Sequence, residues 1–371
     1  DRPRPPGEVP VTVAYKGVAG NAPIALWVVP VAEIGGVARH VLDVARTGLP
    51  RTRMVVLCPP GALAEELTQL GVPVLAESFG PNYGLTASVR VLRHAVAKLR
   101  PAIVHTHLAY ADIVGALAVP LTGPTKLVST EHGIAYDDSV YHGSSFKSAL
   151  MSRAHQVRCE RFDALMACSV ATADAMEAKW HPRRVIDVLH NGVDAPTAPS
   201  QRKEGLRILS LARLAPEKRI LELLKGFSLL KRDYPQATLT IAGTGEEEAA
   251  LRGAVESLGL TDCVDFPGFV DACQALSSHD VLAQLSVWEN CSYSLLDAVV
   301  SGMGVVATPV GGNPEILPSQ CLVDAYDVTA IAQALASQGL ELAQRPQLNP
   351  YWPSVSDMCH SIVKVYQGCF K

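Results

Sequence analysis

The chain has 371 residues, of which 48% are hydrophobic and 18% are charged, and its formal net charge is −4. At roughly 100–200 residues per domain, this length predicts two domains or one large one. The acidic balance argues against a nucleic-acid-binding protein that relies on bulk positive charge. The charge is also unevenly divided. Residues 1–194 carry 19 basic and 17 acidic side chains (net +2), and residues 195–371 carry 13 and 19 (net −6).

The cysteines and the apolar stretches indicate the cellular compartment of the protein. Nine cysteines occur without a CxxC pair, which predicts reduced, mostly buried thiols in a cytoplasmic protein, with neither a disulfide framework nor a zinc site. The longest apolar stretch, residues 22–32, is about half the length of a membrane-spanning helix. The opening DRPRPPGEVP lacks a hydrophobic signal core, so secretion is not indicated.

Short apolar runs alternate with helix-length amphipathic segments from residue 23 onward, and this pattern predicts strands of parallel sheets covered on both faces. Ten runs are expected to be strands: residues 24–30, 53–60, 102–107, 126–132, 164–169, 206–212, 237–243, 264–269, 281–286 and 305–310. The rhythm breaks at NGVDAPTAPSQRKEG, a stretch rich in proline, serine and charge. The predicted fold class is therefore α/β, with two tandem Rossmann-like, doubly wound parallel-sheet domains facing a cleft.

The domain boundaries follow from these patterns. We expect an N-terminal tail over 1–22, a first domain over 23–192, a linker over 193–205, a second domain over 206–350 and a terminal helix over 351–371. Because ligands of open parallel sheets bind beyond the carboxyl ends of the strands, the informative residues should directly follow the apolar runs.

Two features of the first domain lie at such positions. A glycine pair, Gly35–Gly36, follows the first run, where backbone N–H groups at a helix start could approach an anion; a tight turn is the alternative. GxGxxG is absent both here and at 243–248, which disfavours a nicotinamide site.

HTHLAY (105–110) and STEHG (129–133) bring three histidines to strand ends. They fit a buried core, hydrogen bonding to a sugar or phosphate, or zinc, although no acidic third ligand lies nearby.

The second domain carries charged residues at the corresponding places. Arg213 and Lys218 follow a strand, and a guanidinium fork beside an ammonium suits a diphosphate; a solvated charge run is the alternative. Glu289 and Asp297 are eight residues apart and flank a helix predicted to begin around Ser292–Tyr293. Such carboxylates could hold two sets of hydroxyls while the first helical N–H groups face a phosphate, or they could be a helix cap and a surface acid.

In this order and spacing, the motifs resemble retaining glycosyltransferases of the GT-B architecture and family 4 type, in the group that builds bacterial cell-surface glycans. The resemblance covers residues 23–371. It rests on Gly35–Gly36, HTH, TEHG, HNGVD (190–194), Arg213, Lys218, GTGEEEAAL (243–251), the PGF turn (267–269), Glu289 with Asp297, and VGGNPE (310–315). The terminal helix resembles one that crosses back onto the first domain in this family.

The resemblance implies a role for each matching residue. Arg213 and Lys218 neutralise the donor diphosphate, Glu289 holds donor-sugar hydroxyls, and Asp297 holds the ribose. The other implied donor contacts are Gly35, Gly36, Gly243, Phe269, Val270, Ser292 and Tyr293, with backbone around Phe269–Val270 meeting the base. His107 sits beside the reacting face of the sugar, and the first domain holds the acceptor, with His132 and Glu131 on the acceptor side. The implied catalytic group is His107, Glu289, Arg213 and Lys218.

Further expectations follow from the family. The anomeric configuration is retained, and the leaving diphosphate takes the acceptor's proton. The chain has no DxD motif, so we expect metal-independent transfer without a cofactor, from a UDP-sugar first or a GDP-sugar second, to a glycan or lipid-linked acceptor. Asp297 departs from the family's second glutamate and is one methylene shorter. A non-catalytic nucleotide-sugar-binding subunit and a nucleotide-sugar epimerase are the alternative functions.

One segment bears on membrane contact. Residues 146–162 are basic and predicted to be helical, which fits either peripheral docking at the inner face of the cell membrane or a solvated helix with Arg153, Arg158 and Arg161 in water. The sequence predicts no oligomeric state.

Overall fold

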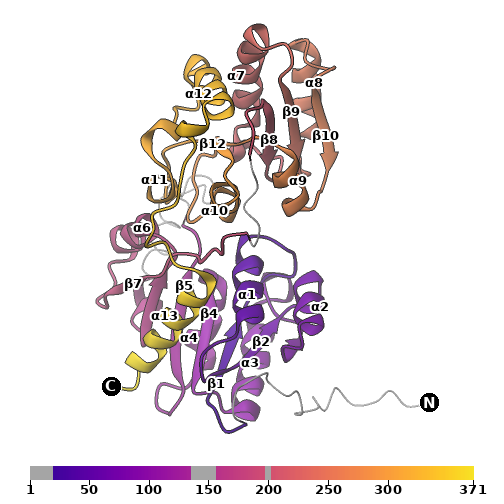
Figure 1. Cartoon of the computed structure of the whole chain (residues 1–371). Helices are drawn as coiled ribbons and strands as arrows, with labels where there is room; N and C mark the ends of the chain where they lie inside the picture. Colours follow the sequence, from indigo (N-terminus) through magenta and orange to yellow (C-terminus); the bar gives the residue numbers. More distant parts are fainter. Residues whose placement is uncertain (1–19, 135–155, 197–201) are drawn as a thin grey trace, which may run out of the picture.

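The computed structural model describes residues 20–134, 156–196 and 202–371. They form two α/β units, each built on one parallel sheet, stacked one above the other along the long axis in Figure 1. None of the helices in these ranges is long and apolar enough to cross a membrane.

The first unit has a seven-stranded sheet in the order β3-β2-β1-β4-β5-β6-β7. Its strands are β1 (Ile24–Val28), β2 (Arg53–Cys58), β3 (Val74–Ala76), β4 (Ile103–His107), β5 (Lys126–Glu131), β6 (Ala164–Ala167) and β7 (Ile186–Val188). Its helices are α1 (Gly36–Thr47), α2 (Ala62–Gln69), α3 (Leu85–Leu99), α4 (Leu108–Ala118) and α6 (Val170–Trp180), with a 3-10 turn at Pro81–Tyr83.

The second unit has a five-stranded sheet in the order β10-β9-β8-β11-β12. Its strands are β8 (Arg207–Leu211), β9 (Thr238–Ala242), β10 (Val264–Gly268), β11 (Val281–Gln284) and β12 (Gly304–Ala307). The helices are α7 (Ile220–Asp233), α8 (Glu248–Ser257), α9 (Ala272–Ser278), α10 (Tyr293–Val300), α11 (Asn313–Ile316) and α12 (Val328–Leu340). The 3-10 turns are Pro216–Lys218, Ser319–Cys321 and Leu342–Gln344.

The predicted fold class is confirmed, and all ten predicted strands are present. Apolar residues run along both faces of each sheet, because helices cover both sides. In β1, Ala25 and Trp27 pack into the core on one side of the sheet, while Leu26 and Val28 pack into the core on the other. Two short edge strands, β3 and β7, did not show as apolar runs.

The last helix, α13 (Val355–Gly368), follows the second unit in sequence but packs on the first, against α1 (Figure 1). Its apolar face enters the core on that side of the first sheet; the buried residues are Val355, Met358, Cys359, Ile362, Val363 and Tyr366. A capping box at Ser354 and Asp357 begins the helix.

A buried hydrogen-bond chain ties α13 to the first sheet. The indole N–H of Trp27 donates to the hydroxyl of Tyr366 (3.0 Å), which lies 2.7 Å from His105 Nδ1. His105 Nε2 lies 2.7 Å from the hydroxyl of Thr130. The Tyr366 hydroxyl accepts from the indole and keeps its own proton to donate to His105, so both ring nitrogens of this histidine have a partner within the core.

We predict that Tyr366→Phe destabilises the first unit. The change strands the indole N–H of Trp27 and Nδ1 of His105, and each unsatisfied buried group costs about 1–3 kcal/mol. The expected result is a lower midpoint in urea denaturation followed by circular dichroism. Tyr351→Phe is the control, because that tyrosine is 93% exposed; equal midpoints for the two variants would contradict the prediction.

Candidate active site

Three of the predicted charged residues meet at the carboxyl edge of the second sheet. Lys218, at the end of the 3-10 turn after β8, places Nζ 2.6 Å from Glu289 Oε1, although the two residues are 71 positions apart. Gln284 Nε2 donates to the same oxygen at 3.2 Å. Arg213 lies at the same edge, is more than half exposed, and pairs with Glu217. The structure therefore joins Lys218 and Glu289 in one ion pair, with a second cation on the same loop.

Glycines allow the loops of this edge to press together. Gly311, after β12, has φ +50°, and a Cβ there would lie 1.6 Å from the carbonyl oxygen of Glu289. Gly243 has φ +136°, and a Cβ would lie 1.9 Å from the carbonyl oxygen of Ala212, next to Arg213. Neither position tolerates a side chain. Gly243, a predicted donor contact, therefore has a packing reason to be glycine.

The helix predicted around Ser292–Tyr293 begins there. Ser292 is the N-cap of α10, its hydroxyl accepting from the N–H of Leu295 at 3.4 Å. The Tyr293 side chain is buried and points to the first unit, where its hydroxyl lies 3.5 Å from His40 Nδ1. Phe269, predicted to lie near the base, is 81% exposed after β10. The neighbouring Val270 packs partly against the core.

Asp297, predicted to hold the ribose, is paired across the domains. Its two oxygens accept from Nη1 and Nη2 of Arg39 at 3.1 and 3.4 Å, while Arg39 Nε donates to Asp43 at 2.7 Å. Burial raises the pKa of Asp297, against the lowering effect of Arg39. A ribose contact at Asp297 would have to displace or share this guanidinium, so that role stays a prediction.

The glycine pair begins α1. Gly35 is its N-cap with extended backbone and no side-chain cap, and a Cβ at Gly35 or Gly36 would meet nothing within 4 Å. Neither backbone conformation nor packing demands glycine at these two positions. The pair instead leaves the N–H groups at the positive end of α1 open to an anion, as the resemblance implies.

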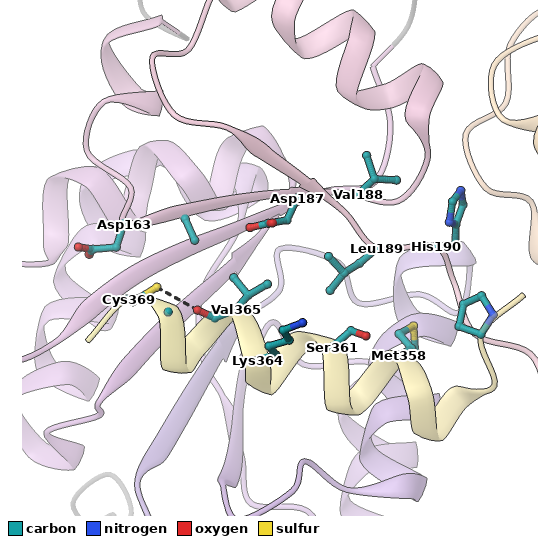
Figure 2. A pocket seen from close by; sticks show the side chains of 13 residues that line it. Asp163, Asp187, Val188, Leu189, His190, Met358, Ser361, Lys364, Val365 and Cys369 are labelled. Carbon is teal, nitrogen blue, oxygen red and sulfur yellow. Dashed lines mark hydrogen bonds between the residues drawn. The ribbon is translucent and has the colours of Figure 1, made fainter. Parts of the chain in front are cut away.

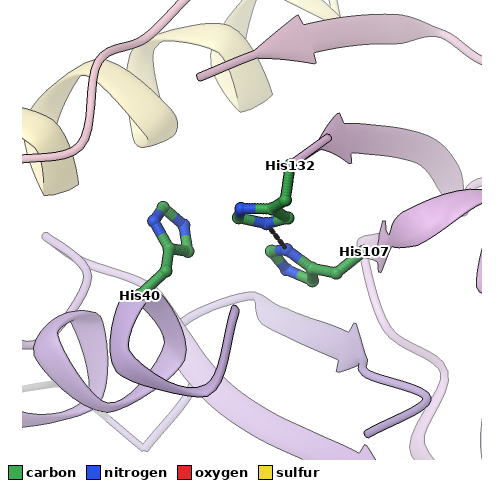
Figure 3. A group of neighbouring side chains, drawn as sticks. All are labelled: His40, His107 and His132. Atoms are coloured by element: carbon green, nitrogen blue, oxygen red, sulfur yellow. Dashed lines mark hydrogen bonds between the residues drawn. The ribbon is translucent and has the colours of Figure 1, made fainter. Parts of the chain in front are cut away.

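His107 at the end of β4 and His132 just after β5 form a cluster with His40 of α1 (Figure 3). His107 Nδ1 lies 2.9 Å from His132 Nε2, and the His40 ring meets that of His132 edge-on at 4.8 Å between centroids. His107 is fully buried. Its predicted contact with the donor sugar requires access that this arrangement does not give, so it also stays a prediction.

Glu131, predicted on the acceptor side, is buried within the first unit. Its carboxylate accepts from Arg158 Nη2 at 3.5 Å and from the N–H of Gly133 at 3.2 Å. Burial raises its pKa to about 7. Asp112 lies 3.5 Å from Arg158 Nε in the same network. This enclosed position disfavours an acceptor contact by Glu131.

The expectation of a solvated or membrane-facing basic helix at 146–162 needs correction at two of its arginines. Arg158 is 4% exposed, and its guanidinium lies over the Trp180 ring. Its charge can be buried inside the domain because Asp112 and Glu131 compensate it. Arg161 donates to the backbone carbonyls of Ala116 and Val119. Arg153 lies outside the described residues.

Contacts between the units gather around Glu315 in α11. Its carboxylate accepts from the N–H groups of Val170 and Ala171, both at 3.0 Å, where α6 begins. It also accepts from His190 Nε2 at 2.7 Å. An acid from the second unit therefore occupies the positive end of a first-unit helix. The motif VGGNPE pointed to this region, but the sequence offered no way to find its partner.

A cavity of about 530 Å³ lies apart from these groups. It is bounded by α13 and the strands β6 and β7, with Asp163, Asp187, Ser361 and Lys364 among its lining residues (Figure 2). Arg213, Lys218 and Glu289 do not line it.

Sequence reasoning also missed Arg39, His40 and Asn191 as site residues. Arg39 and His40 lie three and four residues after Gly36, and Asn191 belongs to HNGVD, so proximity to a motif was the available signal. Their partners, Asp297, Tyr293 and Cys291, lie at least 100 positions away. Only the folded chain shows that these residues face the second unit.

The fold and the site together are those of a GT-B-type transferase. It has two parallel-sheet domains, and an ion-paired lysine, an arginine and helix starts lie at their facing edges. Comparison with known families agrees with this class. Residues 34–196 match the family described as "Glycosyltransferase Family 4", and residues 205–338 match "Glycosyl transferases group 1". The two matches together span most of the chain. The chain belongs to the GT-B glycosyltransferases of family 4 type.

Relatives of known activity support this assignment. The chain is 26% identical over 352 residues to a glycogen synthase of Mycobacterium tuberculosis, covering 84% of each protein. It is 28% identical to a 2-deoxystreptamine N-acetyl-D-glucosaminyltransferase of Streptomyces fradiae, covering 81% of this chain and 77% of the relative. Among solved structures, Anabaena HepE in complex with UDP and glucose aligns with a TM-score of 0.73 at 20% identity, covering 94% of this chain and 98% of HepE.

We predict that Glu315→Gln weakens the contact between the units in a pH-dependent way. Burial acts to raise the pKa of Glu315, but hydrogen bonds from His190, Ala171 and Val170 outweigh it, and the pKa lies below the ordinary 4.5. A depressed pKa stabilises the fold above 4.5, and this stabilisation is lost as the pH falls through the lowered value. The difference in thermal midpoint between wild type and variant should be full at neutral pH and shrink below pH 4.5.

The control for this prediction is Glu256→Gln, which changes an exposed acid on α8. A midpoint difference for Glu315→Gln that does not depend on pH would contradict the assignment of the carboxylate as the charged partner.

Proposed function

We propose that this glycosyltransferase moves a hexose-type sugar from a nucleoside-diphosphate sugar to a hydroxyl of a glycan or lipid-linked acceptor. The proposed donor is a UDP-sugar, and the anomeric configuration is retained without a metal ion. The proposed role is the synthesis of cell-surface polysaccharide. The observation that carries the proposal is the Lys218–Glu289 pair beside Arg213 at the carboxyl edge of the second sheet.

This pair can serve both parts of the donor. Lys218 Nζ has three N–H donors and gives one to Glu289 Oε1, which leaves two for diphosphate oxygens. Glu289 receives both of its side-chain hydrogen bonds on Oε1, so Oε2 is left to accept from sugar hydroxyls. A single ion pair would therefore hold the diphosphate next to the reacting sugar.

The chemistry that follows is mainly electrostatic. As the bond from sugar to diphosphate breaks, negative charge grows on the diphosphate, and the cations Arg213 and Lys218 stabilise it. In the proposed retaining reaction the departing diphosphate accepts the acceptor's proton on the face where the new bond forms. The proposal therefore needs no protein base.

Relatives supply support for donor and acceptor classes. The HepE structures contain UDP, UDP with glucose, or UDP-glucose, which favours UDP in this chain. A glycogen synthase extends a glycan, which fits a glycan acceptor. The 2-deoxystreptamine transferases of Streptomyces fradiae and Streptomyces kanamyceticus keep a small-molecule acceptor as the second candidate.

The first test is a thermal-shift panel of UDP-, GDP- and ADP-sugars with EDTA present. We expect a rise of several degrees with UDP-sugars alone, because a ligand that binds only the folded state stabilises it. Arg213→Ala should abolish the rise. Arg252→Ala is a matched control, since Arg252 is also an exposed arginine of the second unit paired with a glutamate four positions away. No shift with any nucleotide sugar would overturn the donor site.

The second test measures transfer to an acceptor panel of glycans, lipid-linked sugars and 2-deoxystreptamine. Lys218→Ala and Glu289→Gln should each lower the rate about 10–100-fold, because each removes a charge-assisted contact of about 1.5–3 kcal/mol. The panel also separates the alternatives. A transferase consumes donor only with acceptor present, an epimerase converts donor alone, and a non-catalytic subunit binds donor without consuming it.

A further inference from the structure

Three imidazoles from separate elements of the first unit converge on one point. His40 comes from α1, His107 ends β4, and His132 follows β5, and one ring nitrogen of each lies within 4.8 Å of the others (Figure 3). The donor-site roles proposed above do not account for His40.

The protonation state of His40 follows from its partners. Asn191 Nδ2 donates to the carbonyl of Cys291 at 2.9 Å, so its Oδ1 is the atom 3.2 Å from His40 Nδ1 and can only accept. Nδ1 therefore carries the proton. Burial lowers the pKa of His40 to about 4, which keeps the ring neutral at pH 7. Nε2 is then a lone pair, and it is buried without a hydrogen-bond partner.

His107 is also left with an unmet ring nitrogen. Its Nδ1 shares a proton with His132 Nε2, and its Nε2 is buried without a partner. Burial and neighbouring histidines lower the pKa of His107 and His132 well below the ordinary value, so both rings are neutral. His105, two residues earlier, has a hydroxyl on each nitrogen. Burial alone thus does not explain why Nε2 of His40 and of His107 lack hydrogen-bond partners, because His105 on the same strand is equally buried and has a partner on each ring nitrogen.

We propose that His40, His107 and His132 form a binding site for a divalent transition-metal ion, Zn²⁺ by preference, and that the bound ion obstructs sugar transfer. Neutral imidazoles are the ligand form, and three of them with one open position suit zinc. Zn–N bonds of 2.0–2.1 Å place tetrahedral ligand nitrogens about 3.3 Å apart. The three ligand nitrogens already lie within 4.8 Å of one another, so small side-chain rotations reach that spacing. Asn191 would accept from the other ring nitrogen of His40 and so hold the orientation of the ring, as hydrogen-bond partners of zinc-bound histidines do.

The obstruction rests on the proposed function together with the position beside the donor sugar that the family resemblance implies for His107, a contact for which the buried ring must become accessible. An ion at the cluster would hold His107 and His132, and the loop just after His132 touches the donor loop. A Cβ at Gly133 would lie 2.6 Å from Asn290 Nδ2. The expected sign is the reverse of a metal-dependent transferase, because the ion lowers the rate and a chelator restores it.

The binding test uses the full chain, stripped with a chelator and dialysed against ZnCl₂ or CoCl₂. Wild type should retain one zinc per chain and give the intense visible absorption of tetrahedral Co²⁺. His40→Gln and His132→Gln should lose both, while His94→Gln, on the exposed side of α3, should keep both. Zinc content unchanged in the two cluster variants overturns the site. So does zinc lost only in Cys273→Ser, which would assign the ion to the exposed thiol.

Two further readouts keep the test decisive. Circular dichroism and the shift given by a UDP-sugar, which reports the second unit, show whether each variant is folded. The binding result therefore stands even if the proposed donor fails. In the transfer assay, one equivalent of Zn²⁺ should lower the wild-type rate at least tenfold and EDTA should restore it. The ratio of rates with and without zinc should return to one in His40→Gln. Bound zinc without a fall in rate overturns the obstruction.

Discussion

One short segment, residues 190–194, bonds to the second unit and to the last helix, and so connects three parts of the structure. His190 donates to Glu315, and Asn191 donates to the carbonyl of Cys291. Gly192 lies so close to the start of the last helix that a Cβ there would be 2.5 Å from the carbonyl oxygen of Ser354. Asp194 accepts from the N–H of Val355 at 3.1 Å. Five consecutive residues thus fix the first sheet, the loop before α10 and the beginning of α13 against one another.

The charges of the donor edge are already paired before any donor binds. Lys218 pairs with Glu289, Arg213 with Glu217 and Arg39 with Asp297. A dianionic diphosphate that binds here replaces carboxylates as the partner of these cations. The free energy of binding is therefore the difference between the contacts made with the diphosphate and those made with the carboxylates. Because an unpaired partly buried charge is costly, each pair also holds its loop in place. The exposed Arg213 is the least constrained of the three cations.

Much of the fold was predictable, because most of the longer strands are runs of mainly apolar residues buried on both faces. Residues 53–60 and 102–107 predicted β2 and β4 for this reason. The edge strands β3 and β7 escaped because each has only three residues and is only partly buried. In the site, Lys218 and Glu289 could be found because each follows a strand. The link from Asp297 to Arg39 could not, since it spans 258 positions and depends on how the two units meet. The burial of Glu131 could not be predicted from the sequence either, because the Arg158 that compensates its charge belongs to another segment of the chain.

The position of α13 has a consequence for how the protein is made. A ribosome completes residues 24–188, which supply every strand of the first sheet, well before it reaches Val355. Until then Trp27, His105 and the inner side of α1 lack the helix that covers them. The N-terminal domain therefore emerges with an uncovered apolar face, although domains that emerge first usually fold first. The second domain, whose strands are contiguous in sequence and whose core adds only Cys168 and Val193 from earlier in the chain, can complete its own folding earlier. Nascent chains of this protein are thus expected to need protection at the end that was synthesised first.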